Sequence, residues 1–240
     1  KYAKYYKLIY IFNILVLLSV YVVGVKRLGA QRWIDLGPIS VQPSEIGKIL
    51  VILTFSEFLV SKYRDRFIGL KSVMISFLHI LPVFLLILRQ PDLGTALILM
   101  MTYFVLIFIH GIDWKSIIIM VITGIISVPT AFFFFLKDYQ KQRVLTFLNP
   151  EADLLGSGWN VTQSMIAIGS GGLYGKGFLN STQSKLRFLP EAHTDFIGSV
   201  FLEERGFVGG VVLLGLYLIL ILQIVYIADT TEDKYGRLVC

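Results

Sequence analysis

Long apolar runs separated by short polar segments make up most of the 240-residue chain. A helix needs about 20 apolar residues, within a range of roughly 17 to 25, to cross the hydrocarbon layer of a membrane. Six segments come close to that length and are predicted to span a membrane: residues 8–25, 45–60, 72–88, 93–109, 116–136 and 207–228. The pattern predicts an all-α polytopic membrane protein, a helical bundle in which residues 1–240 form a single transmembrane domain.

The stretch 137–206 is a long connection between two predicted spans. Connections of this length are more often functional than incidental. Its apolar part, residues 196–202, is too short to cross a membrane before Glu203 and Glu204, so we expect it to dip partway into the bundle. The predicted bundle therefore carries a long loop with partly buried helices.

Composition agrees with this class. Hydrophobic residues make up 55% and charged residues 16% of the chain, against about 25% charged in soluble domains, and the mean hydropathy is +0.73. A soluble enzyme, a disordered chain and a disulfide scaffold are excluded. The single cysteine, Cys240, cannot form an internal disulfide. Because the sequence begins at Lys1 and stops soon after an apolar segment, we expect it to be part of a longer protein.

The distribution of basic residues predicts the orientation. With six crossings both ends lie on one side, where the short connections carry ten Lys and Arg residues, against four on the other side. The positive-inside rule then places both termini in the cytoplasm and residues 137–206 outside. The net charge of +6 forms no stripe away from the membrane flanks, so no nucleic-acid partner is expected.

Three outer sites, residues 42–45, 90–92 and 190–195, combine proline with an acid in a pattern typical of a helix start. Proline suits the first helical position, and an acid there meets the positive end of the helix dipole. The first two helices run inward, so their unpaired N–H groups favour an anion such as a phosphate on the outer face. A simpler interpretation of Asp92 is that it only begins its helix and has no further role.

Two sets of charged residues near the predicted spans each allow a functional interpretation and a simpler, structural one. Glu45 and Lys48 share a helical face and either pair with each other or mark a functional site one turn into a membrane helix. Asp195 lies four residues after Glu191 and beside His193. Held partly desolvated, its carboxylate would have the raised proton affinity that a general base needs, whereas His193 also fits a structural, hydrogen-bonded histidine.

Two other kinds of site are not expected. Residues 168–177 are rich in glycine, but no predicted strand precedes them and no GKS or GKT sequence follows, so a nucleotide loop is excluded. Tight turns that hold the outer loop near the membrane are the simpler interpretation. Three scattered histidines and one cysteine give no tetrahedral zinc spacing.

Four blocks together resemble the SEDS (shape, elongation, division, sporulation) family of bacterial cell-wall polymerases. They are GAQRWIDLGP at 29–38, QPSE at 42–45 with Lys48, QPDLGT at 90–95 and LPEAHTDFI at 189–197. Further segments are more similar to its elongation branch than to its division branch: 138–143, 149–151, 163–164, 166–172, 175–177 and 182–183. The resemblance covers essentially the whole chain. Gly198 departs from it, because the family usually has a bulky aromatic residue there.

The resemblance implies a ten-helix protein, of which this chain matches the third to eighth helices. It implies a peptidoglycan glycosyltransferase of cell elongation that polymerises lipid II, a disaccharide-pentapeptide on undecaprenyl pyrophosphate. It also implies a divalent cation, Mg or Mn, and a class B penicillin-binding protein as partner. The protein would be a multi-pass protein of the bacterial cytoplasmic membrane, in contact with membrane lipid, with its active site facing outward.

The resemblance assigns the catalytic role, and the residues themselves suggest the other roles. Asp195 would be the general base. Lys48 and Arg32 would hold the pyrophosphate, and Asp92 and Glu45 would hold the metal or orient Lys48. Trp33 would contact the lipid or a sugar, or serve only as an interface anchor. The remaining expected substrate contacts are Gln163, Glu191 and His193.

Three alternatives stay open. A flippase for lipid-linked cell-wall precursor also needs charges inside a helical bundle, although here the charges gather on one face rather than along the membrane depth. A division-specific polymerase of the same family is the second alternative. The third is a scaffold that recruits a transpeptidase without chemistry of its own.

Overall fold

The computed structural model describes residues 3–27, 30–35, 37–64, 66–136, 138–149, 157–186, 188–189 and 192–240. The chain divides into two compact units, which are described separately. Unit 1 comprises Lys1–Thr123 and Val225–Cys240, and unit 2 comprises Gly124–Ile224.

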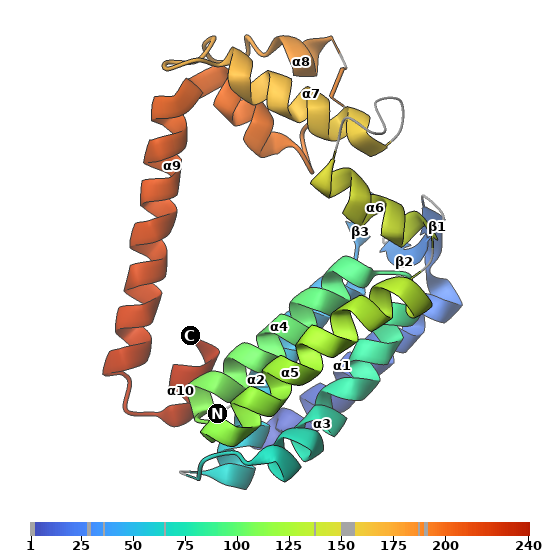
Figure 1. Cartoon of the computed structure of the whole chain (residues 1–240), viewed down its shortest axis with the longest axis vertical. Helices are drawn as coiled ribbons and strands as arrows, with labels where there is room; N and C mark the ends of the chain where they lie inside the picture. Colours follow the sequence, from blue (N-terminus) through green and yellow to red (C-terminus); the bar gives the residue numbers. More distant parts are fainter. Residues whose placement is uncertain are drawn as a thin grey trace. The chain divides into compact units, whose positions relative to one another are not determined.

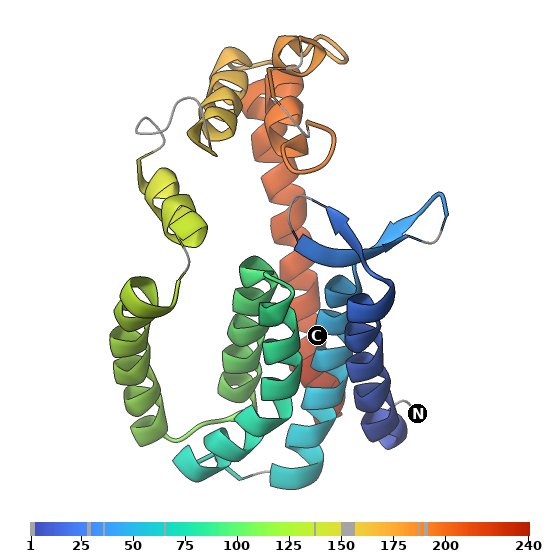
Figure 2. The same cartoon turned by 90° about the vertical axis from the view of Figure 1, so that its right-hand side faces the viewer.

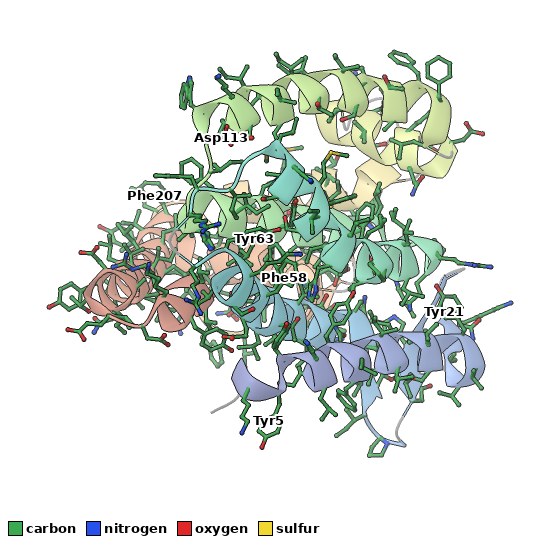
Figure 3. The ribbon with its side chains drawn as sticks, turned by 90° about the horizontal axis from the view of Figure 1, so that it is seen from below. Tyr5, Tyr21, Phe58, Tyr63, Asp113 and Phe207 are labelled. Atoms are coloured by element: carbon green, nitrogen blue, oxygen red, sulfur yellow. The ribbon has the colours of Figure 1, made fainter. Side chains whose placement is uncertain are left out.

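Unit 1 is built mainly from helices that pack side by side (Figure 1). They are η1 (Ala3–Tyr5), α1 (Tyr6–Val23), α2 (Pro43–Tyr63), α3 (Leu70–Arg89), α4 (Leu93–His110), the start of α5 (Trp114–Thr130) and α10 (Lys234–Val239). Helix α2 contacts α1, α3, α4 and α10. Its buried residues Val51, Phe55 and Leu59 belong to the hydrophobic core. Viewed from below, Phe58 and Tyr63 of α2 lie among these helices, with ring centres 6.2 Å apart (Figure 3).

Five helices of the described residues are long and apolar enough to cross a membrane: α1, α3, α4, α5 with its extension to Phe134, and α9 (Ile197–Thr230). Helix α2 covers the predicted span 45–60 and is 21 residues long, but it is not in this group. Its charged residues Glu45, Lys48, Glu57 and Lys62 account for the difference. Because α2 packs against four other helices, much of its surface faces protein.

A small sheet, which the sequence analysis did not predict, follows α1. Strands β1 (Val25–Arg27), β2 (Ala30–Asp35) and β3 (Ser40–Val41) pair antiparallel in the order β1-β2-β3. Figure 2 shows the sheet at one end of α1 and α2, where β2 contacts both helices. Gln31 donates side-chain hydrogen bonds to the carbonyls of Val20 and Gly24. These bonds satisfy the end of α1 and fix β2 beside it.

Unit 2 contains the π-helix η2 (Ala131–Phe135), α6 (Asp138–Leu148), α7 (Ser157–Ser170), α8 (Thr182–Lys185) and most of α9. Helix α7 contacts α6 and α8 (Figure 1). Helix α9 is interrupted at Gly206, where φ is 64° and ψ is −165°. A short helix therefore precedes a long apolar one that begins at Phe207, the first residue of the predicted span 207–228.

Candidate functional site

In unit 1, Asp92 is the centre of a polar cluster. Its side chain caps α4 by accepting a hydrogen bond from the Thr95 N–H at 3.2 Å. The Thr95 hydroxyl donates to it at 2.9 Å, and the Gln42 amide, just before α2, donates at 2.7 Å. Pro43 and Leu93 begin their helices as the sequence predicts, and Asp92 also joins the two helix starts. It is therefore more than a local cap.

Strand β2 brings a cation to this cluster. Arg32 Nη1 lies 3.7 Å from Asp92 Oδ1, and the two side chains are 27% and 7% exposed. The Arg32 Nε atom is buried and has no hydrogen-bond partner among the described residues. Arg32 and Asp92 are thus together, and part of the Arg32 side chain stays open to another acceptor. Trp33, the next residue of β2, is partly buried.

Glu45 and Lys48 form the ion pair that their spacing indicates. Lys48 Nζ lies 3.0 Å from Glu45 Oε1, and the side chains are 20% and 56% exposed, respectively. An ammonium group has three donors, so this contact leaves Lys48 able to bind a further anion. The pair lies in the first two turns of α2, the helix that Gln42 links to Asp92.

In the observed arrangement, the oxygen atoms of the Asp92 cluster do not fit the coordination of a permanently bound divalent cation. Both carboxylate oxygens already accept hydrogen bonds, and Arg32 lies beside them. Glu45 instead pairs with Lys48. Among the described residues, no group of three or more His, Cys, Asp and Glu side chains is arranged to hold a metal. For Asp92 and Glu45 to act as the predicted ligands, both side chains would have to give up these contacts.

In unit 2, Asp195 and His193 are both exposed in the turns of residues 192–196, just before α9. The predicted helix start at 190–195 is therefore displaced: α9 begins at Ile197, and the Phe196 carbonyl accepts the first hydrogen bonds, from Ser199 and Val200. Unit 2 by itself does not provide the partial desolvation expected for Asp195. An exposed carboxylate is accessible to a reacting hydroxyl.

The other expected contacts in this unit differ in accessibility. Gln163 lies on α7 with 8% of its surface exposed, so it is poorly placed for a direct substrate contact within unit 2. Glu191 lies outside the described residues. Gly198 has no atom within 4 Å of where a Cβ would stand, so a larger side chain has room there.

Sequence reasoning missed a buried carboxylate, Glu203, which is 0% exposed. Lys176 Nζ lies 2.7 Å from Glu203 Oε1. The Thr182 backbone N–H and hydroxyl donate to the same oxygen at 2.9 and 2.8 Å, and the Ser181 hydroxyl donates to the other oxygen. These contacts fasten residues 176–182 to the short helix at the start of α9. The sequence gives little sign of this role, because Glu203 directly follows the apolar residues 196–202 and begins the charged run with Glu204 and Arg205.

The glycine-rich stretch packs directly against the same helix. The backbone N–H groups of Lys176 and Gly177 donate to the carbonyls of Glu203 and Glu204, both at 3.0 Å. Gly172 and Gly175 have φ angles of 56° and 80°. A Cβ added at Gly175 would overlap the backbone oxygen of Glu204. The predicted tight turns are present, and they bring two backbones into contact.

Gly175→Ala is expected to destabilise unit 2 more than Gly172→Ala. Both substitutions impose a positive φ on alanine, which costs about 1–3 kcal/mol. Only the Cβ at Gly175 meets backbone, whereas at Gly172 nothing lies within 4 Å. Forcing atoms into a packed contact adds about 1–3 kcal/mol. Thermal unfolding in detergent measures the difference, and equal losses of stability would show that the two backbones are not in contact.

The spans and the polar clusters define a multi-pass helical membrane protein with charged groups held at helix ends. The model of the FTSW_RODA_SPOVE family, described as cell cycle protein, matches residues 1–240, and the chain belongs to this family. The chain is 44% identical over 232 residues to the Escherichia coli K12 protein named peptidoglycan glycosyltransferase MrdB. It is 38% identical over 226 residues to a probable peptidoglycan glycosyltransferase FtsW of Trichlorobacter lovleyi.

These relatives are longer than the chain. The matches cover 95% and 93% of this chain but 61% and 58% of the two relatives. A solved structure described as structural coordination of polymerization and crosslinking by a peptidoglycan synthase complex matches with 33% identity and a TM-score of 0.78, over 99% of this chain and 65% of that one. Thermus thermophilus rod shape determining protein RodA matches with 29% identity and a TM-score of 0.64, over 99% and 60%.

Proposed function

We propose that the protein is a peptidoglycan glycosyltransferase that polymerises lipid II during cell elongation, with Asp195 as general base. The observation that carries the proposal is the 44% identity, over 95% of the chain, to a protein named as such an enzyme. The segments that are more similar to the elongation branch of the family than to its division branch support the elongation role. The Asp195 carboxylate is exposed, so an acceptor hydroxyl can reach it.

In the proposed reaction Asp195 accepts the proton of an acceptor-sugar hydroxyl as that oxygen attacks the anomeric carbon of the donor. A carbon–oxygen bond forms between the sugars, and the bond to the lipid pyrophosphate breaks with its electron pair. Lys48 and Arg32 bind the departing anion. The Lys48 and Arg32 side chains, 20% and 27% exposed, support this role, because cations partly shielded from water bind phosphate more strongly than fully exposed ones.

The divalent cation implied by the resemblance would neutralise a pyrophosphate leaving group. Since the hydrogen bonds at Asp92 do not fit a resident metal, we assign the cation to the substrate, and no residue role above depends on it. Asp92 then orients Arg32 and the two helix starts.

The proposed location is the bacterial cytoplasmic membrane with the active site facing outward, supported by the excess of basic residues in the opposite connections. The proposed partner is a class B penicillin-binding protein. Support comes from the solved synthase complex, which is described as coordinating polymerization with crosslinking. Crosslinking calls for a second catalytic domain beside the glycosyltransferase.

Purified full-length protein in detergent tests this function directly. With lipid II and Mg²⁺, glycan strands are expected to form and to be resolved by gel electrophoresis. A flippase has no compartments to connect in detergent and makes no polymer. Absence of strands, together with lipid II transfer across vesicles containing the protein, would establish the transport alternative instead.

A further inference from the structure

At one end of unit 1 lies a cavity of about 180 Å³ lined by four basic side chains: Arg64, Arg66, Lys234 and Arg237. It is formed by the C-terminal ends of α2 and α4, the segment leading into α3, and α10, which contacts both α2 and α4. Figure 3 looks onto this end, where Tyr63 marks the last residue of α2. None of these residues belongs to the proposed catalytic machinery.

Local structure explains only part of this positive charge. Arg237 donates hydrogen bonds to the carbonyls of Ala228 and Asp229 at the end of α9, and cations are favourable at helix C-termini. Arg64 and Arg66 are different. Within the described part of the chain, no carboxylate forms an ion pair with either guanidinium, so both charges are available to a ligand.

The backbone at Arg64 is in a conformation that is uncommon for arginine. Arg64 has a φ of 46°, in a region that favours glycine and that other residues occupy at a cost of about 1–3 kcal/mol. Glycine would end α2 there without that cost. The nearby acid Asp233 uses its carboxylate to cap α10 through the N–H groups of Tyr235 and Gly236, and it does not line the cavity.

The other residues that line the cavity, and its position relative to the membrane, indicate which kind of anion it binds. Val60 and the buried Leu238 give it apolar sides. Phe67 and Trp114, 76% and 73% exposed, lie at the same end of the helices, as aromatic side chains do at membrane interfaces. Since α4 ends at His110 on the cavity wall, the cavity lies at headgroup level. Its volume equals that of several waters of about 30 Å³ each, enough for a phosphate group.

We propose that this cavity binds the phosphate of an anionic phospholipid headgroup. Basic pockets between membrane helices bind such headgroups on the cytoplasmic side, which is where the distribution of Lys and Arg places this end. The acyl chains extend along the exposed apolar helix surfaces, and the phosphate lies between Arg64 and Arg66. The site is independent of glycan polymerisation.

The test compares two double variants of the full-length protein in nanodiscs. Arg64→Gln with Arg66→Gln removes two charges from the cavity, whereas Lys71→Gln with Lys115→Gln removes two exposed charges at the same end that do not line it. Native mass spectrometry measures the phosphatidylglycerol retained in preference to phosphatidylcholine. A loss of roughly ten- to thirtyfold is expected for the first pair and little change for the second. Arg64→Lys with Arg66→Lys should keep most of the preference.

If both double Gln variants lose the same amount of phosphatidylglycerol, the lipid is attracted by the charged surface in general, and the proposal is overturned. Unchanged retention of phosphatidylglycerol in the variant with Arg64→Gln and Arg66→Gln would also overturn it. The last experiment is a competition with inorganic phosphate. If millimolar phosphate displaces phosphatidylglycerol from the unaltered protein, the cavity binds the free anion and the lipid assignment is wrong. Resistance to phosphate supports the lipid, because acyl contacts then contribute to binding.

Discussion

Asp195→Asn is expected to lower the rate of lipid II polymerisation by roughly 100- to 10,000-fold, the range that positioned general bases contribute. An amide cannot accept the proton of the acceptor hydroxyl, while its shape is nearly that of the carboxyl group. Because Asp195 is exposed in turns before α9, folding should be unaffected. Initial rates at saturating lipid II, with thermal unfolding measured beside them, separate chemistry from stability.

Glu204→Gln is the matched control, since it removes a negative charge from the same stretch of chain. Its rate is expected to stay within a few-fold of the unaltered protein. A rate for Asp195→Asn close to that of the control would mean that another group takes the proton. Binding of lipid II should persist in both variants, because the cations assigned to the pyrophosphate are elsewhere in the sequence.

Local features of this protein could be predicted from sequence because their causes are local. Pro43 and Asp92 define the starts of α2 and α4 through preferences that act within one helical turn. The ion pair of Glu45 and Lys48 follows from helical spacing alone. The break at Gly206 agrees with the predicted span start because the charged residues 203–205 directly before it end the apolar pattern.

Contacts between distant segments could not be predicted in the same way. Gln42 and Asp92 are 50 residues apart, and Lys176 and Glu203 are 27 apart. No periodicity links such pairs before the chain folds. The short strands were missed because their pairing depends on neighbours such as Val25 and Trp33 more than on propensity. The expected desolvation of Asp195 likewise requires surroundings that sequence does not specify.

Lys176→Met is expected to destabilise unit 2 by about 3–5 kcal/mol, the cost of removing one partner from a buried charge pair. The Glu203 carboxylate is 0% exposed and would keep its charge away from water without its ammonium partner. The hydroxyls of Ser181 and Thr182 would still donate to it, but neutral donors compensate a buried charge less well. Lys185→Met, an exposed position of the same unit, controls for the loss of a surface lysine.

A double-mutant cycle isolates the pair. Glu203→Leu alone removes the carboxylate to which Lys176, Ser181 and Thr182 donate, whereas Lys176→Met with Glu203→Leu removes both charges. The double variant should be more stable than the sum of the two single losses predicts, with a coupling of about 0.5–3 kcal/mol. Additive losses, measured by thermal unfolding, would show that the two groups do not interact energetically.

The same substitutions should also affect catalysis. Glu203 lies eight residues after Asp195, on the short helix that the contacts with Lys176 and Thr182 hold in place. Loosening these contacts below the unfolding temperature should lower the polymerisation rate without removing the base. Full activity in a Lys176→Met variant whose loop is cleaved rapidly by protease would show that the helix carrying Glu203 does not position Asp195.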